Sequence, residues 1–106
     1  MAADDVLLVW CTCPADAAGP LAEALVGDRL AACVNRIGPV QSTYRWQGAI
    51  ECASETLLAI KTTAARYPAL QARLRELHPY ELPEIIATSV SNGLPDYLAW
   101  VRGGVV

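Results

Sequence analysis

Residues 40–48 read VQSTYRWQG, and this stretch decides the fold. Side chains alternate along it, so that Tyr44 and Trp46 share one face of an extended strand. Gln47-Gly48 then begins a hairpin turn, and residues 51–62 form the return strand. A hairpin of this length extends past the sheet of a small domain. Its unpaired edge requires a cover, and the simplest cover is another copy of the chain.

The chain before the hairpin predicts a strand, a helix and a second strand. Residues 5–13 are an almost continuous apolar run, which is typical of a central strand buried on both faces. Apolar residues then recur at helical spacing over residues 21–26. The breakers and the helix entry that precede this repeat are Pro14, Asp16 and Gly19-Pro20. Residues 31–37 predict the second strand, and Gly38-Pro39 is a bend or bulge within it.

An amphipathic helix is predicted after the hairpin. Thr62 or Thr63 caps its start, and Pro68 is tolerated because it falls in or near the first turn. The apolar face carries three leucines at helical spacing: Leu70, Leu74 and Leu77. The helix stops at residues 78–85, HPYELPEI, a stiff segment in which each proline restricts the residue before it.

The last part of the chain predicts a strand over residues 85–90 and a short helix over residues 94–102, with Asp96 as a possible cap. The order is therefore β-α-β, a long hairpin, β-α-β and a terminal helix. This order predicts an α+β fold of the ferredoxin-like, split-βαβ type, with an antiparallel sheet and helices on one face. One domain spans residues 1–106.

Composition narrows the classes of partner. The net charge of −3 gives no basic surface, so nucleic acid is not an expected partner. The apolar run Val6–Cys13 is too short to span a membrane and follows two aspartates, where a signal peptide would carry positive charge. The chain is therefore expected in the cytoplasm, and its cysteines are expected to be thiols in a reducing compartment: Cys11, Cys13, Cys33 and Cys52.

Two kinds of residue suggest a metal site. Cys11 and Cys13 point to the same side of a strand, about 6.6 Å apart, so two thiolates can share a soft cation such as Cu(I) or Zn²⁺. The alternative is that both thiols are buried as small apolar groups. His78 is the only imidazole in the chain, and it is either a cation at a helix C-terminus or a metal ligand or proton shuttle.

A second possible site is a polar pocket for a small anion or metabolite. Lys61, Tyr80, Glu81 and Glu84 can form it, unless Lys61 is simply a solvated strand residue. No signature marks an activated nucleophile, and no glycine-rich phosphate loop is present. The sequence therefore predicts a protein that is not an enzyme and that uses no organic cofactor.

Several motifs together resemble one known family. In chain order they are residues 30–35 (LAACVN), 42–48 (STYRWQG), 61–62 (KT), 78–85 (HPYELPEI) and 97–100 (YLAW). This set is similar to the divalent-cation tolerance proteins of the CutA type, over nearly the whole chain from Leu7 to Trp100. The resemblance implies a ferredoxin-like subunit that assembles into a homotrimer through its long hairpins.

The resemblance also implies a ligand. Family members are linked to tolerance of copper and other divalent cations, with copper(II) bound by a cysteine that matches Cys11 and a histidine that matches His78. A second histidine one position earlier is replaced here by Leu77, so weaker binding is implied. Glu81 and Glu84 are possible additional ligands.

A rival function follows from the likeness of the family to the trimeric PII signalling proteins. On that interpretation the chain binds a small molecule or a protein partner in a cleft between subunits. The residues expected near that cleft are Lys61, Tyr80, Glu84 and Trp100.

Overall fold

The computed structural model describes all residues from Met1 to Val106. Its strands and helices follow the predicted order. They are β1 (Val6–Cys13), α1 (Ala15–Gly27), β2 (Cys33–Trp46), β3 (Ala49–Thr63), α2 (Tyr67–Leu77), β4 (Ile85–Ser89) and α3 (Pro95–Gly104). None of the helices is both long enough and apolar enough to cross a membrane.

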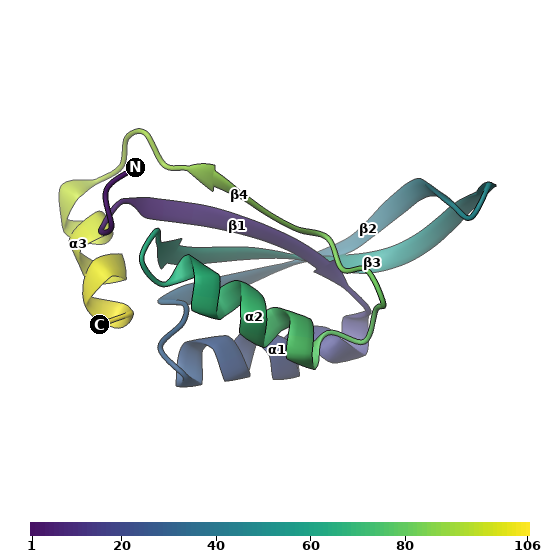
Figure 1. The fold of residues 1–106 in the computed structure, drawn as a ribbon, viewed down its shortest axis with the longest axis horizontal. Helices are drawn as coiled ribbons and strands as arrows, with labels where there is room; N and C mark the ends of the chain where they lie inside the picture. Colours follow the sequence, from purple (N-terminus) through teal and green to yellow (C-terminus); the bar gives the residue numbers. More distant parts are fainter.

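The four strands form one sheet in the order β2-β3-β1-β4, and every neighbouring pair is antiparallel. Helices α1 and α2 cover one face of this sheet, while α3 lies at the end of the sheet beside the N-terminus (Figure 1). β1 is paired on both sides, as its apolar sequence predicts. The α+β, ferredoxin-like prediction is therefore confirmed.

The core lies between the sheet and the two covering helices. Alternate residues of β3 point into it, because successive side chains of a strand face opposite sides. Leu58 and Ile60 are fully buried there, together with Leu25 of α1 and Leu70 of α2. The other alternation of β3, which includes Lys61, lies on the face opposite the helices, called the open face below.

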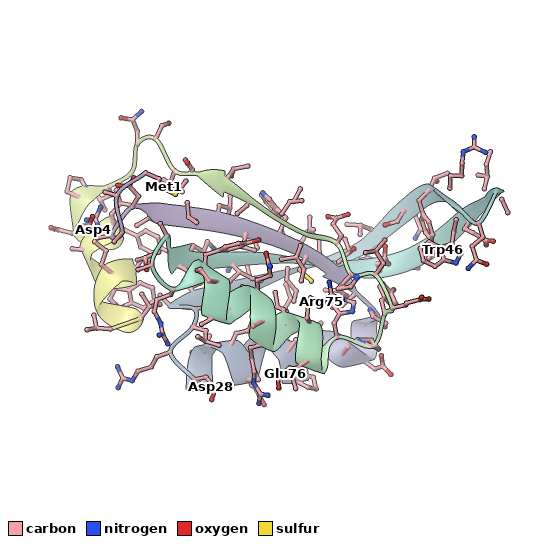
Figure 2. All side chains as sticks on the ribbon, viewed as in Figure 1. Met1, Asp4, Asp28, Trp46, Arg75 and Glu76 are labelled. Atoms are coloured by element: carbon pink, nitrogen blue, oxygen red, sulfur yellow. The ribbon has the colours of Figure 1, made fainter.

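The hairpin of β2 and β3 is the longest feature of the molecule. Trp46 pairs with Ala49 across a two-residue turn, in which Gln47 and Gly48 have φ of 49° and 83°. Two positive φ values are typical of a type I′ turn, whose twist suits a hairpin. A bulge shifts the register between Ile37 and Val40, which confirms the predicted bend or bulge. The arm extends well beyond the sheet, with Trp46 near its tip (Figure 2), and gives the chain a length of 44 Å.

The predicted helix entry at Pro14 and Asp16 is confirmed, but the prediction that Gly19-Pro20 also precedes the helix is wrong. Helix α1 begins directly after Pro14, and Pro20 lies inside it. A proline within a helix removes one backbone hydrogen bond. Here burial of three side chains along the same helix offsets that loss: Ala18, Leu21 and Leu25.

The predicted caps are also wrong. The residue before α2 is Arg66 and the residue before α3 is Leu94, and neither helix start has a side-chain cap. Thr62 instead donates its hydroxyl to the backbone carbonyl of Leu30, at 2.7 Å in the core. Leu77, predicted on the apolar face of α2, is 37% exposed and is the last residue of that helix.

Candidate functional site

Cys11 and Cys13 lie at the end of β1, on the core face of the sheet. Both side chains are fully buried, as the alternative interpretation of small apolar groups predicts. Burial raises the pKa of the Cys11 thiol to about 12, and the nearby Cys13, Glu84 and Glu55 add to the effect because negative charge disfavours a thiolate. Burial raises the pKa of Cys13 as well. Both groups are therefore thiols at neutral pH.

His78 immediately follows α2 and is 7% exposed. Its Nε2 lies 2.8 Å from the backbone carbonyl oxygen of Thr12, and its Nδ1 lies 3.1 Å from the backbone nitrogen of Tyr80. A carbonyl oxygen only accepts and a backbone N–H only donates, so Nε2 carries the ring proton and Nδ1 is unprotonated. The imidazole therefore joins the end of α2 to β1 with both nitrogens engaged.

The two predicted metal ligands, Cys11 and His78, donate hydrogen bonds to the same backbone oxygen. The Cys11 thiol donates to the same Thr12 carbonyl oxygen, at 3.7 Å, that accepts from His78. Sulfur, nitrogen and oxygen donors therefore converge at the end of β1. No group of three or more His, Cys, Asp or Glu side chains is arranged to hold a metal ion. A cation here has at most two side-chain ligands and one carbonyl from this chain, unless a further group moves in.

A groove lies beside this point, between the hairpin arm and the segment that leads into β4. It has a volume of about 970 Å³. At its wall the Tyr80 hydroxyl donates to Glu55 Oε2 at 2.8 Å. Burial and this hydrogen bond raise the pKa of Tyr80, so the phenol keeps its proton. Aromatic, apolar and charged side chains line this groove, among them Tyr44, Arg45, Trp46, Glu55, Tyr80, Glu81, Leu82, Glu84 and Ile86.

The structure separates the predicted pocket residues into two places. Tyr80, Glu81 and Glu84 line the groove. Lys61 lies six residues from Glu55 along β3, roughly 20 Å away at the rise of an extended strand. The Lys61 ammonium contacts Asn35 Oδ1 and lies 3.8 Å from Cys33 Sγ.

Trp100 lies on α3, where its ring stacks on that of Tyr97 at 5.6 Å. Neither Lys61 nor Trp100 lines the groove. Within one chain, these residues therefore do not form one pocket with Tyr80 and Glu84.

Sequence reasoning missed Glu55. This carboxylate is only 6% exposed, although no lysine, arginine or histidine forms an ion pair with it. One signal was available, since Glu55 shares the alternation of Leu57 and Ala59 and therefore belongs on the open face of the sheet rather than on a solvated edge. Its partner Tyr80 is 25 residues away, which no local pattern indicates.

Comparison with known proteins agrees with the fold and with the motifs. Residues 7–103 match the family model described as CutA1 divalent ion tolerance protein. The chain is 44% identical over 100 residues to the divalent-cation tolerance protein CutA of Thermus thermophilus, covering 93% of this chain and 95% of that protein. It covers 55% of the length of the mouse and human CutA proteins, to each of which it is 47% identical.

Solved structures give the same result. The crystal structure of CutA from Xylella fastidiosa has a TM-score of 0.94 at 48% identity, over 96% of this chain and 99% of that chain. The PII-like protein CutA from Nostoc sp. PCC 7120 has a TM-score of 0.89 at 33% identity, over 94% and 97% of the two chains. With its fold, its motifs and nearly its whole length matched, the chain belongs to the CutA1 divalent ion tolerance protein family.

Proposed function

We propose that this chain forms a homotrimer that binds divalent cations, with copper(II) as the first candidate ion and with Cys11 and His78 as its side-chain ligands. The observation that supports the ligands is their convergence on the Thr12 carbonyl oxygen. Imidazole and oxygen donors suit copper(II), and thiolate suits copper(I) and zinc. The proposed role is binding rather than catalysis, carried out by one domain that spans residues 1–106. We place the protein in the cytoplasm, where its four unpaired thiols stay reduced.

The surroundings of both ligands make the proposed affinity weak and dependent on pH. Cys11 must lose a proton that its raised pKa of about 12 retains, and His78 must give up a hydrogen bond. Binding therefore strengthens as the pH rises. The negative charge of Glu84 contributes to the raised pKa of Cys11, which makes this carboxylate the first candidate for a further ligand. Glu81, which lines the same groove, is an alternative.

Calorimetric titration of copper(II) tests the ligand assignment. We expect the Cys11→Ser/His78→Ala double variant to lose most of the heat and at least tenfold in affinity. The matched control is Cys52→Ser, which removes the exposed thiol on the hairpin and should leave the curve unchanged. Identical curves for the wild type and the double variant would exclude Cys11 and His78 as ligands.

The trimer is supported by the surface that one chain leaves exposed. Its accessible area is 6292 Å², against about 5,700 Å² for a typical monomer of this mass. The outer edges of β2 and β4 are unpaired. Large apolar side chains are exposed on β2 and β3, on β4 and the segment before it, and on α3 and the residue before it: Ile37, Tyr44, Trp46, Ile50, Leu82, Ile86, Leu94 and Trp100.

Light scattering at micromolar concentration tests the assembly directly. We expect a mass of three chains of 11.3 kDa each. Ile86→Asp places a charge on an exposed apolar position of β4 and should lower that mass, whereas Glu51→Gln on the arm should not. A wild-type protein that is monomeric at this concentration would refute the trimer.

A second candidate function is PII-like binding of a small molecule in the groove. The observation that favours it is a volume near the upper end of the usual range for ligand pockets, with the Tyr80–Glu55 hydrogen bond in its wall. In the assembled trimer we place Lys61 and Trp100 of one copy near the groove of another. A crosslink between Lys61 and a carboxylate of the groove should then join two chains, and no such crosslink should form within a single chain.

A further inference from the structure

The loop between β4 and α3 contains a chemically reactive pair of residues. Residues 90–94 read VSNGL, so that Asn92 is followed directly by Gly93. The backbone nitrogen that follows an asparagine can attack the carbonyl carbon of its side chain, and glycine obstructs this attack least because it has no side chain. The chain has two asparagines, and only Asn92 precedes a glycine.

The structure leaves both reacting groups free. Asn92 and Gly93 are exposed and belong to no helix or strand. The Asn92 side-chain amide has no hydrogen-bond partner, and the Gly93 N–H donates to no acceptor. The backbone hydrogen bonds on either side of the pair are donated by Val90 and by Leu98. Neither of these bonds prevents the Gly93 nitrogen from turning toward the Asn92 side chain.

The position of this loop separates it from the groove and from the hairpin. It lies at the end of the sheet beside the N-terminus, opposite the tip of the hairpin (Figure 1). Neither Asn92 nor Gly93 lines the groove. The attack also joins two consecutive residues of one chain and requires no other molecule than water. Neither a ligand nor a second copy of the chain therefore has to supply a reacting group.

Asn35 is a natural control within the same chain. It lies in β2, where it pairs with Ala59 of β3, and its Oδ1 is in contact with the Lys61 ammonium. The residue that follows it is Arg36, whose side chain obstructs the backbone nitrogen. Strand pairing holds this part of the backbone extended, so the same attack is disfavoured at Asn35.

We propose that Asn92 deamidates spontaneously in the folded protein and that its isoaspartate product loosens the docking of α3. In the first step the Gly93 nitrogen bonds to Asn92 Cγ, the Cγ–Nδ2 bond breaks, and ammonia leaves with the proton of the Gly93 N–H. Water then opens the resulting succinimide at either carbonyl, which gives aspartate or isoaspartate. Water enters, ammonia leaves, and no oxidant is needed. The net charge of the chain changes from −3 to −4, because one neutral amide becomes one carboxylate.

The effect on α3 follows from the packing of Gly93. A Cβ added to this residue would lie 2.9 Å from Cδ2 and 3.0 Å from Cγ of Leu98, so the Leu98 side chain packs directly against Gly93. This contact ties the loop to α3, whose last turn is tied to the N-terminal segment by Arg102 Nε, 2.9 Å from the carbonyl oxygen of Asp4. Isoaspartate adds one carbon to the main chain before Gly93. The added length displaces Gly93 from Leu98 and weakens the hold on the start of α3.

Ageing of the full-length, assembled protein tests the site. Samples are kept at neutral and at mildly alkaline pH, and peptide mass spectrometry measures the loss of the amide at each asparagine. We expect loss at Asn92 that is faster at the higher pH, because the attacking nitrogen must give up its proton, and no measurable loss at Asn35. Asn92→Gln is the matched control. Its longer side chain must close a larger ring, so the aged variant should keep its charge in ion-exchange chromatography.

Trypsin cleavage after Arg102 measures the docking of α3. We expect residues 103–106 to be released faster from the isoaspartate fraction than from fresh protein. Asn92→Asp carries the same charge without the added carbon and should be cleaved like fresh wild type, which separates the effect of chain length from that of charge.

Three results would overturn parts of this inference. If the assembled protein keeps the Asn92 amide while urea-unfolded protein loses it, the folded chain does not support the reaction. If Asn35 loses its amide as fast as Asn92, the loop has no special reactivity. If the isoaspartate fraction is cleaved no faster than fresh protein, the product does not loosen α3.

Discussion

Replacing Tyr80 by Phe removes one hydroxyl and leaves Glu55 without its hydrogen-bond donor. A hydrogen bond to a charged group contributes about 1.5–3 kcal/mol. The other carboxylate oxygen faces the groove and keeps contact with water, so we expect the low end, about 1.5 kcal/mol of lost stability. Glu55→Gln should cost less, about 0.5 kcal/mol, because the amide oxygen still accepts from Tyr80.

Urea denaturation at one fixed protomer concentration measures these losses, because the stability of an oligomer depends on concentration. The control is Tyr67→Phe, which removes a phenol that donates to the neutral, exposed side chain of Gln71 at 2.8 Å. That change should cost about 0.5 kcal/mol or less. In the double variant of Tyr80 and Glu55 we expect a coupling of about 1 kcal/mol. If the loss of stability in the double variant equals the sum of the two single losses to within about 0.3 kcal/mol, the hydrogen bond does not stabilise the groove.

The same pair predicts a dependence on pH. The pKa of Tyr80 is raised in the folded chain, whereas tyrosine in an unfolded chain titrates near its usual value of 10.0. Above pH 10 the unfolded chain loses a proton that the folded chain keeps, so the hydrogen bond stabilises the wild type fully below pH 10 and progressively less above it. Above pH 10 the free energy of unfolding of Tyr80→Phe should fall less steeply than that of the wild type. If the two free energies fall in parallel, the raised pKa does not belong to Tyr80.

Four further predictions follow from the core, the thiols and the turn. Leu25→Ala, at a fully buried position of α1, should lower the free energy of unfolding by about 3–5 kcal/mol, whereas Val26→Ala beside it, 43% exposed, should change it by less than about 0.5 kcal/mol in urea denaturation. In mass spectrometry after brief alkylation of the native protein, Cys52 should be modified first, and Cys11 and Cys13 only after denaturation; early labelling of Cys11 would contradict its burial. Because the pKa of Cys11 is raised from 9.0 to about 12, the folded chain keeps a proton that the unfolded chain loses above pH 9, and Cys11→Ala should reduce the resulting loss of stability between pH 9 and pH 11. Gly48→Ala should destabilise the protein by about 1 kcal/mol because φ is 83° there, while Gln47→Asn should stabilise it by a few tenths of a kcal/mol, both measured in thermal unfolding.

The strands and the turn were predictable because their causes are local. Alternation around Tyr44 and the dipeptide Gln47-Gly48 determine the hairpin with no reference to the rest of the chain. The inclusion of Gly19-Pro20 in α1 was not predictable, because Pro20 breaks a helix only when tertiary packing does not offset the lost hydrogen bond. Thr62 likewise has the chemistry of a cap, but the Leu30 carbonyl, 32 residues away, takes its hydroxyl.

The site was predictable only in part, for the same reason. The composition of the segment 78–85 predicted a stiff connector and left open whether it carries a site, and the structure places Tyr80, Glu81 and Glu84 of that segment in the groove. The double engagement of His78 depends on the Thr12 carbonyl, 66 residues away, and a backbone oxygen leaves no trace in a sequence. Glu55 resembles a solvated strand residue until the chain around it is folded.

The central place of β1 has a consequence for synthesis of the chain. β1 leaves the ribosome first, yet one of its neighbours, β3, ends at Thr63 and the other, β4, ends at Ser89. The apolar segment Val6–Cys13 therefore waits, unpaired, until most of the polypeptide has been made. During that interval it is the part of the nascent chain most in need of a chaperone. A ribosome-bound chain in which Thr63 has just left the exit tunnel should be able to form the hairpin and pair β3 with β1, but it still lacks β4, the second neighbour of β1.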